Sequence, residues 1–230
     1  EGHGIRIYQN KTYPFKKDPP NAPTKWNPVG SYRREFEVSS DWNGRETCIV
    51  FDGVQSAFYL WVNGEKVGYS QGSRTPAEFN ISKYLKPGKN MLAVEVYRWN
   101  DGSYLEGMDF WRLSGMYRDV YLWSTAKSHI RDFTVTTELD DIYEDAVLKV
   151  KTEILNPAGS VEVQLLDPSG KEVGRADSPS APSGALEIPV KTPSKWTAET
   201  PVLYTALLTL KDTSGKTVEV IPQRVGFRKV

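Results

Sequence analysis

The sequence is poor in the side chains that carry nucleophilic or metal-dependent catalysis. Its 230 residues contain one cysteine and two histidines. Cys48 lies in the apolar run CIVF, so it cannot form an internal disulfide and is expected to be a buried thiol. Neither His3, expected in a frayed terminus, nor His129 belongs to a Ser/His/Asp or Cys/His pattern, and HExxH, CxxC and EF-hand motifs are absent. We therefore expect no catalytic centre built on cysteine, histidine or a bound metal.

Net charge and long apolar runs are also absent. Lys plus Arg and Asp plus Glu each number 29, so the formal net charge is zero. This balance implies no basic face, and we expect no nucleic-acid partner. No apolar run reaches about 18 residues and no signal-peptide pattern occurs, so we expect no membrane span. Because the chain starts at Glu1 rather than at methionine, we expect that an upstream part has been removed, which leaves the compartment open between cytoplasm and periplasm.

Helical periodicity is missing as well. No amphipathic helical pattern of about ten residues or more occurs in the sequence. Residues 1–30 contain five prolines, at positions 14, 19, 20, 23 and 28, which obstruct a helix and predict an extended segment wrapped over a surface. From Ser31 onward the apolar residues recur with a period of two, which is typical of β-strands.

The clearest local element is a β-hairpin. Residues 57–62 and 65–69 read as strands, and Asn63-Gly64 between them supplies the positive φ angles of a type I′ turn. Residues 79–85 are compatible with a single helical turn capped by Asn80.

The second half of the sequence differs in composition, because six of the seven tryptophans precede residue 124 and only Trp196 follows it. Its short strand patterns are separated by turn signals and predict an immunoglobulin-like sandwich of about 100 residues. The expected strands cover residues 130–135, 146–155, 160–166, 186–190, 203–210 and 217–221. Residues 177–184 (DSPSAPSG) are expected to form a polar loop or a sheet crossing. The residues alone thus predict two all-β domains, divided near residue 126.

The most distinctive stretch covers residues 98–122 and reads RWNDGSYLEGMDFWRLSGMYRDVYL. It separates two expected strands, residues 91–97 and 119–123, by about twenty residues, whereas a hairpin turn needs about two to five. Its acidic residues are Asp101, Glu106 and Asp109. Carboxylates accept hydrogen bonds from hydroxyl groups and aromatic rings cover apolar C–H faces, so this acidic and aromatic composition suits a sugar.

Composition alone leaves two interpretations of these acidic residues open. Glu106 and Asp109 are candidates for a glycosidase pair, whose carboxyl groups lie about 5–5.5 Å apart in a retaining enzyme. The alternative is a solvated acidic loop whose aromatic side chains turn inward. Proximity in the sequence does not decide between the two. A phosphate-binding loop is not expected, because the glycine-rich run at residues 68–72 follows a strand and opens no long helix.

Several parts of the sequence together resemble the amino-terminal region of family 2 glycoside hydrolases, and specifically of the β-galactosidases. Residues 51–79 (FDGVQSAFYLWVNGEKVGYSQGSRTPAEF) and the stretch at residues 98–122 carry most of the resemblance. Two shorter motifs, YQNKTYP at residues 8–14 and RVGFR at residues 224–228, occur in the same order as in that family.

The resemblance implies an all-β chain, with a jelly-roll β-sandwich over residues 1–126 that binds sugar and an immunoglobulin-like β-sandwich over residues 127–230. In the family, a (β/α)₈ barrel follows and bears two catalytic glutamates, one acid/base and one nucleophile, in a retaining mechanism. The alternating strand and helix pattern of that barrel does not occur in this sequence. We therefore expect no catalytic residue within the chain.

The resemblance also implies which residues approach a substrate. Asn10 in YQNKTYP and Asp109 in DGSYLEGMDFWR match positions beside the bound galactose. Asp109 is further implied as a sodium ligand, with the other ligands supplied by the barrel. A carboxylate suits both tasks as a hard oxygen ligand and a charged acceptor, and an amide both donates and accepts. The alternatives are a turn-capping carboxylate at Asp109 and an Asx-turn at Asn10.

Gln71 and Asp101 resemble positions that contribute to a structural magnesium site in some family members. The other ligands of that site come from residues upstream of Glu1, so we expect no magnesium binding by this chain alone. Three aromatic residues are expected to pack beneath the stretch at residues 98–122 rather than to bind sugar: Trp99, Tyr104 and Trp111.

Three functions are to be distinguished. The resemblance favours a non-catalytic N-terminal fragment of a β-galactosidase, inactive alone, that supplies part of the galactose pocket and supports the missing barrel. The whole enzyme would hydrolyse terminal β-D-galactosides, with the galactoside, the barrel and possible further copies of itself as partners. A second function is an independent carbohydrate-binding module. A third is a fragment of another family 2 glycosidase, a β-glucuronidase or β-mannosidase, against which the run DGSYLEGMDFWR argues.

Overall fold

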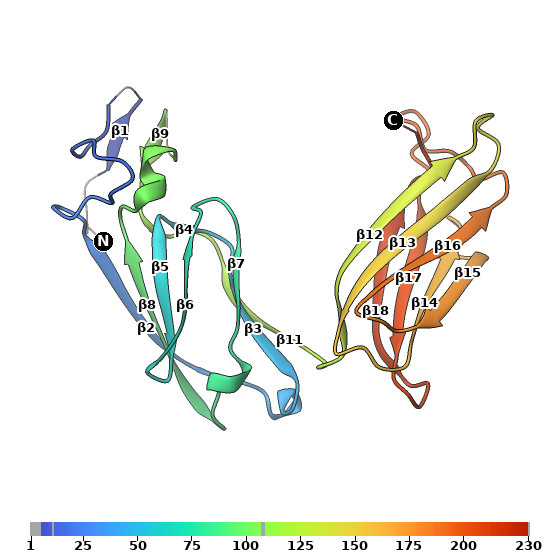
Figure 1. The fold of residues 1–230 in the computed structure, drawn as a ribbon, viewed down its shortest axis with the longest axis horizontal. Helices are drawn as coiled ribbons and strands as arrows, with labels where there is room; N and C mark the ends of the chain where they lie inside the picture. The colour runs from blue at the N-terminus through green and yellow to red at the C-terminus, as the bar shows by residue number, and fades with distance from the viewer. Residues whose placement is uncertain (1–5, 11, 107–108, 230) are drawn as a thin grey trace. The chain divides into compact units, whose positions relative to one another are not determined.

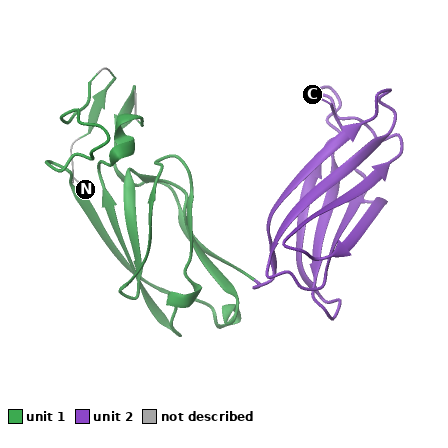
Figure 2. Cartoon of the chain, viewed as in Figure 1, with its two compact units in different colours: residues 1–125 green, residues 126–230 purple. Residues whose placement is uncertain are grey.

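The structure, a computed structural model, describes residues 6–10, 12–106 and 109–229. The chain forms two compact units, residues 1–125 and residues 126–230 (Figure 2). Both are built from antiparallel strands, and the described residues contain no α-helix. The predicted fold class is thus confirmed as a jelly-roll sandwich followed by an immunoglobulin-like sandwich. His3 lies outside the described residues, and so does the prediction made for it.

The first unit is a sandwich of two antiparallel sheets. Its strands are β1 (Ile7–Gln9), β2 (Val29–Glu37), β3 (Glu46–Phe51), β4 (Val54–Gln55), β5 (Ala57–Val62), β6 (Glu65–Gln71), β7 (Ala77–Asn80), β8 (Lys89–Tyr97), β9 (Phe110–Arg112), β10 (Gly115–Met116) and β11 (Val120–Thr125). Short 3-10 helices are η1 (Ser40–Trp42), η2 (Ser82–Tyr84) and η3 (Asp101–Tyr104). The larger sheet has the order β2-β8-β5-β6 and the smaller one β11-β3-β7, with β1-β9 and β10-β4 as separate pairs (Figure 1).

The predicted hairpin is confirmed. Asn63 and Gly64 have φ angles of 54° and 87°, in the left-handed region that a type I′ turn requires. Val62 lies opposite Glu65, so a two-residue turn joins β5 to β6. This turn sets the register of β6, the strand that ends at Gln71.

The helical turn predicted over residues 79–85 is shorter than expected. Phe79 and Asn80 belong to β7, where they pair with β3, and only Ser82–Tyr84 form the turn η2. Asn80 still supports the turn, because its Oδ1 accepts a hydrogen bond from the Ser82 N–H at 3.0 Å. The sheet satisfies the backbone groups of the first two residues, which is why the helix does not begin there.

Aromatic side chains join the two sheets of the first unit. Phe51 on β3 and Phe58 on β5 are buried, with ring centroids 4.8 Å apart. Leu60 is fully buried in the same cluster. Cys48 is buried in β3, as predicted. Close packing of this kind keeps the strands rigid, so the segments that they connect have fixed points of attachment.

The second unit is the immunoglobulin-like sandwich. Its strands are β12 (His129–Leu139), β13 (Ala146–Leu155), β14 (Ser160–Leu166), β15 (Glu172–Pro179), β16 (Ser183–Val190), β17 (Tyr204–Lys211) and β18 (Thr217–Val225). One sheet has the order β12-β13-β16 and the other β15-β14-β17-β18. Alternate residues of β13, β14 and β17 are buried, as their period of two predicts.

One predicted loop of this unit is largely strand. Residues 177–184 end β15 and begin β16, which leaves residues 180–182 as the connection. Asp177 pairs with Glu162 of β14 in this arrangement. The sequence pattern conceals β15 because it is an edge strand of its sheet, carries polar residues and has no buried residue.

His129, at the start of β12, is buried. Its Nδ1 lies 2.9 Å from the carbonyl oxygen of Ala126 and 3.3 Å from that of Lys127. Through these contacts His129 helps to fix the backbone at the start of the second unit, which is a structural role.

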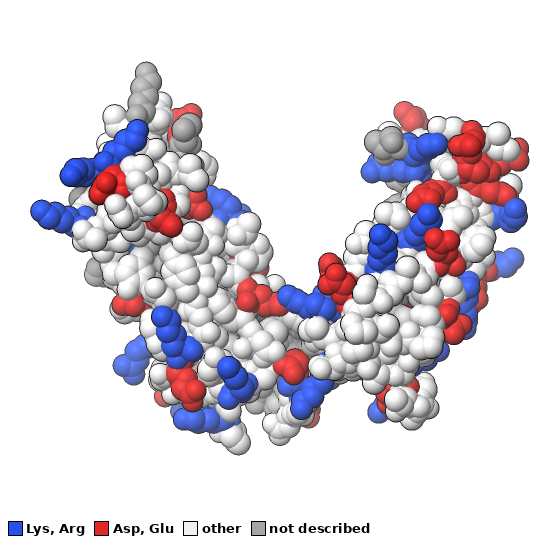
Figure 3. Space-filling view, viewed as in Figure 1, with Lys and Arg blue, Asp and Glu red and all other residues white. Residues whose placement is uncertain are grey.

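On the face that Figure 3 shows, Lys and Arg side chains are interspersed with Asp and Glu side chains over both units. This mixture agrees with the zero net charge of the sequence. In the part of the chain that the structure describes, no helix has the length and apolar character needed to cross a membrane.

We predict that Leu208→Ala destabilises the second unit much more than Leu207→Ala. Leu208 is fully buried on β17, whereas its neighbour Leu207 is only partly buried. Truncating a fully buried leucine costs about 2–5 kcal/mol of unfolding free energy. Guanidinium-induced unfolding of the 230-residue chain measures both variants. Equal losses for the two variants would show that the assigned faces of β17 are wrong.

Candidate functional site

The stretch between β8 and β11 is folded. Its described residues contain η3, β9 and β10. β9 pairs with β1, and β10 pairs with β4. We call residues 98–119 the acidic segment. Pairing with strands that are distant in the sequence fixes the backbone that carries its acidic and aromatic side chains.

The N-terminal arm, residues 12–28, packs against the start of the acidic segment. The Tyr104 hydroxyl donates to the Asn21 carbonyl oxygen (2.8 Å) and accepts from the Asp18 N–H (3.1 Å). The Trp99 N–H donates to Asn27 Oδ1 (2.9 Å), and Asn27 Nδ2 donates to the Trp99 carbonyl oxygen (3.0 Å). Trp99 and Tyr104 are buried under these contacts, as predicted.

Trp111 does not pack beneath the segment, and the prediction for it is wrong. Its side chain is 52% exposed, and its ring centroid lies 5.5 Å from that of Tyr8. Neighbouring residues of a strand face opposite sides, and Arg112 occupies the inward position of β9 with 6% exposure. Trp111 therefore faces outward.

Arg112 is a buried cation whose hydrogen bonds connect β9 to the first part of the acidic segment. Its Nη1 donates to the carbonyl oxygens of Ser103 and Glu106, each at 3.4 Å. Its guanidinium lies 6.0 Å from the centroid of the Tyr13 ring. Burial lowers the pKa of Arg112, but a guanidinium remains charged at neutral pH. Sequence analysis did not single out this residue, because no strand was expected between residues 97 and 119.

Asn10 and Asp109 lie at the adjoining ends of the β1–β9 ladder. Gln9 pairs with Phe110, so Asn10 follows the last paired residue of β1 and Asp109 precedes the first of β9. Both residues are exposed. Asp109 has a φ angle of 51°, in the left-handed region that Asp and Asn enter more readily than most residues. The structure thus brings together the two residues that the sequence analysis assigned to the substrate.

Tyr8 contacts the Asp109 carboxylate directly. Its hydroxyl donates a hydrogen bond of 2.5 Å to Asp109 Oδ1. This hydrogen bond, and to a lesser extent the negative charge of Asp109, raise the pKa of Tyr8, because a phenolate here would face a carboxylate. Sequence analysis did not single out Tyr8, although it precedes Asn10 by two residues in the motif YQNKTYP.

Glu106 has a different set of partners from Asp109. Its Oε1 accepts from the Ser73 N–H (3.0 Å), and its Oε2 accepts from the Ser73 hydroxyl (2.5 Å). Ser73 is fully buried, and its carbonyl oxygen accepts from the Tyr117 hydroxyl. Glu106 therefore fastens the acidic segment to the β6–β7 connection, which is a structural task.

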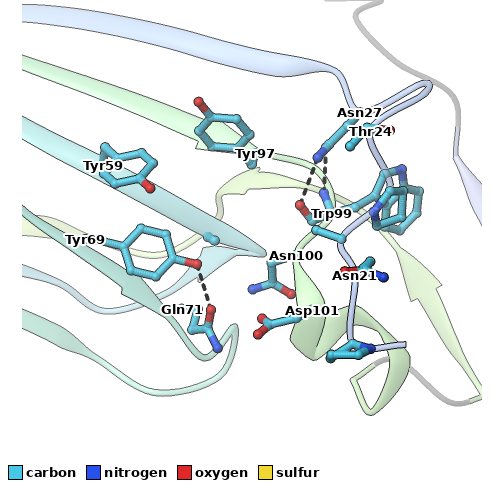
Figure 4. A pocket seen from close by; sticks show the side chains of 14 residues that line it. Asn21, Thr24, Asn27, Tyr59, Tyr69, Gln71, Tyr97, Trp99, Asn100 and Asp101 are labelled. Carbon is cyan, nitrogen blue, oxygen red and sulfur yellow. Dashed lines mark hydrogen bonds between the residues drawn. The ribbon is translucent and has the colours of Figure 1, made fainter. Parts of the chain in front are cut away.

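Gln71 and Asp101 line a cavity of about 790 Å³ between the N-terminal arm and strands β5, β6 and β8 (Figure 4). The Tyr69 hydroxyl, in the same cavity, donates to Gln71 Oε1 at 2.7 Å. Burial is the main cause that raises the pKa of Tyr69, and the negative charge of Asp101 adds to it. The described residues that line the cavity do not include Asn10 or Asp109, so the two predicted sites occupy different places.

Comparison with protein families gives two matches that together span nearly the whole chain. The family described as glycosyl hydrolases family 2, sugar binding domain, matches residues 1–126. The family described as glycosyl hydrolases family 2 matches residues 128–228.

Curated relatives include β-galactosidases of several bacteria. The chain is 47% identical to that of Priestia megaterium, over 99% of the chain and 24% of the relative. It is 45% identical to that of Pseudoalteromonas haloplanktis, over 97% of the chain and 23% of the relative. The chain thus spans about a quarter of the length of these relatives.

Solved structures with a similar fold include two β-glucuronidases. The enzyme from Bacteroides uniformis has a TM-score of 0.75 and 24% identity, covering 89% of this chain and 27% of that one. The enzyme from Bifidobacterium dentium, complexed with coumarin-3-O-glucuronide, has a TM-score of 0.74 and 23% identity, covering 87% of this chain and 39% of that one. At these identities the likeness supports the fold alone.

We predict that Asp109→Asn lowers the pKa of Tyr8 toward its ordinary value. The substitution removes the negative charge that disfavours the phenolate, while asparagine tolerates the left-handed backbone of this position. An NMR titration of the Tyr8 ring measures the pKa. Glu106→Gln is the control, because Glu106 bonds to Ser73, and it should leave the Tyr8 titration unchanged. An unaltered pKa in Asp109→Asn would contradict the hydrogen bond.

Proposed function

The chain belongs to glycosyl hydrolases family 2, and on this premise we propose that it is the non-catalytic N-terminal part of a β-galactosidase. The whole enzyme hydrolyses terminal β-D-galactosides. This chain supplies part of its galactose-binding cavity and supports the catalytic barrel, which lies outside the chain.

Sequence identity favours a galactoside over a glucuronide as the substrate. Curated relatives between 39% and 47% identical, matched over 97% to 100% of the chain, are named β-galactosidases. The β-glucuronidases among the similar structures are 23% and 24% identical, which supports the shared fold without the choice of sugar.

The observation that carries the proposal is the position of Asn10 and Asp109. The β1–β9 ladder sets both residues at one end of the first unit's small strand pair, and both are exposed to a ligand. Their carboxylate and amide can accept and donate hydrogen bonds to the hydroxyl groups of a sugar. Trp111, two residues from Asp109, is about half exposed and offers an apolar face for its C–H groups.

The catalytic step belongs to another part of the enzyme. A retaining glycosidase needs two carboxyl groups about 5–5.5 Å apart, on either side of the bond that is cleaved. In this chain Glu106 is held by Ser73 through both carboxylate oxygens. We therefore assign the acid/base and the nucleophile to the barrel, and a binding task to Asp109.

A sodium ion fits the chemistry of Asp109. The carboxylate is exposed, and among the described residues the Tyr8 hydroxyl is the hydrogen-bond donor that reaches it. Such a hard oxygen ligand suits a hard cation. The ion would supply a positive charge that attracts a sugar hydroxyl oxygen, and the barrel would supply its other ligands.

A magnesium ion fits the cavity that Gln71 and Asp101 line, because both side chains offer oxygen atoms to it. In the described part of the chain no three His, Cys, Asp or Glu side chains are grouped to hold a metal. Gln71 and Asp101 would therefore hold the ion together with groups from outside the chain, as a structural site.

We predict that the 230-residue chain alone does not hydrolyse a chromogenic β-galactoside above background. The reason is that Ser73 holds both carboxylate oxygens of Glu106, and we assign both catalytic carboxyl groups to the barrel. Turnover that survives purification and is lost in Asp109→Asn would contradict this prediction.

Calorimetric titration of the same chain with galactose separates the proposal from an independent carbohydrate-binding module. The proposal expects little binding, since the barrel completes the cavity. A dissociation constant of about 1 mM or tighter, equivalent to about −4.1 kcal/mol, would favour the module.

In the longer protein, we predict that Asp109→Asn weakens galactoside binding about 10- to 100-fold. Hydrogen bonds to charged groups contribute about 1.5–3 kcal/mol, and the carboxylate charge also attracts sodium. The melting temperature should stay unchanged, because Asp109 is exposed. Asp41→Asn, at an exposed carboxylate of η1, is the matched control. Parental binding across a sodium titration would remove Asp109 from the site.

A further inference from the structure

The geometry of the β1–β9 ladder ties Tyr8 to Asp109. Tyr8 pairs with Trp111, and their ring centroids are 5.5 Å apart. Asp109 precedes Trp111 by two residues and lies just before β9, in a left-handed backbone conformation. A diagonal cross-strand neighbour lies about 7–8 Å away, within reach of an aromatic side chain. The Tyr8 hydroxyl accordingly meets Asp109 Oδ1 at 2.5 Å.

The Asp109 side chain depends on this contact for its orientation. Asp109 is exposed, and it lies just before the first paired residue of β9, so the ladder itself does not hold it. Among the described residues, the Tyr8 hydroxyl is the hydrogen-bond donor that its carboxylate accepts from. Hydrogen bonds between a hydroxyl and an ionised carboxylate are among the stronger and more directional ones.

We propose that Tyr8 is a positioning residue: its hydroxyl holds Oδ1 of Asp109 and so fixes the carboxylate, leaving Oδ2 for a galactoside hydroxyl or a sodium ion. The inference rests on the proposed function, because it concerns the same site. It adds a specific cause for the affinity of that site, namely that one carboxylate rotamer is selected before the ligand arrives.

The ring and the hydroxyl of Tyr8 have separable tasks. The ring packs on Trp111, and the hydroxyl contacts Asp109. Tyr8→Phe keeps the first contact and removes the second. Because Tyr8 is 50% exposed, the variant should fold with little change in melting temperature. A merely structural tyrosine would change stability, whereas a positioning tyrosine changes the order of Asp109 and ligand binding.

The first test is NMR on the 230-residue chain. In the parent, the χ1 couplings of Asp109 should report one rotamer, and in Tyr8→Phe they should average over several. The carboxyl carbon shift of Asp109 should move at the same time. Tyr121→Phe is the control, since Tyr121 is similarly exposed at 46% and lies on β11. A single rotamer in Tyr8→Phe would overturn the proposal.

The second test is ligand binding by the longer protein. Immobilising a flexible side chain at a binding site corresponds to about a two- to tenfold change in affinity. Tyr8→Phe should therefore raise the dissociation constant for galactose and the sodium concentration at half-saturation by about that factor. The Michaelis constant should rise more than kcat falls. Tyr121→Phe should behave like the parent.

A double-mutant cycle identifies the route of the effect. If Tyr8 acts through the carboxylate, Tyr8→Phe should add nothing to the loss caused by Asp109→Asn. Additive losses would overturn the positioning role. Galactose binding that is weakened by Asp109→Asn but not by Tyr8→Phe would overturn this inference and leave the proposed function standing. A parent protein that binds no galactoside would overturn both.

Discussion

The candidate site depends on backbone pairing between two short strands. β1 and β9 share three paired positions, from Ile7 opposite Arg112 to Gln9 opposite Phe110. So short a ladder is weak in isolation, because an isolated strand pair is marginal in water. It persists because the N-terminal arm is anchored next to it, through Tyr104 and Asn27. The exposed end of the ladder is thus held by a buried base, and this permits Asn10 and Asp109 to remain in contact with solvent.

The buried base of the ladder contains a positive charge, the guanidinium group of Arg112. Burying a charge costs free energy unless hydrogen bonds compensate it. Arg112 donates to two carbonyl oxygens and lies over the Tyr13 ring, and both contacts stabilise its charge. Its planar fork also fixes the two carbonyl groups relative to each other. Because the hydrogen bonds of Arg112 Nη1 go to backbone carbonyl oxygens, the Asp109 carboxylate stays exposed at the end of the ladder.

The sequence predicted the strands well where one face of each strand is apolar. The bounds of β13 and β14 agree with the period of two, and Asn63-Gly64 identified the hairpin. β15 was missed because an outermost strand carries polar residues on its solvated side. The orientation of Trp111 was also beyond the sequence, since it depends on which residue of β9 turns toward the arm.

The candidate site was predicted only in part. Asn10 and Asp109 could be named from the motifs that contain them, but their proximity results from a ladder between distant residues. No local pattern encodes such a pairing, because hydrophobic periodicity describes faces and not partners. Tyr8 was missed for the same reason. Its contact with Asp109 exists only once the register of β1 against β9 is known.

The length of chain between the two strands has a consequence for biosynthesis. Tyr8 and Asp109 are 101 positions apart, so β1 leaves the ribosome long before its partner strand β9 does. At about 5–20 residues per second, β1 waits roughly 5–20 s for β9 to emerge. The five prolines of residues 1–30 keep this waiting stretch from folding into a competing helix. The end of the first unit that carries Asn10 and Asp109 is therefore among its last parts to form on a nascent chain.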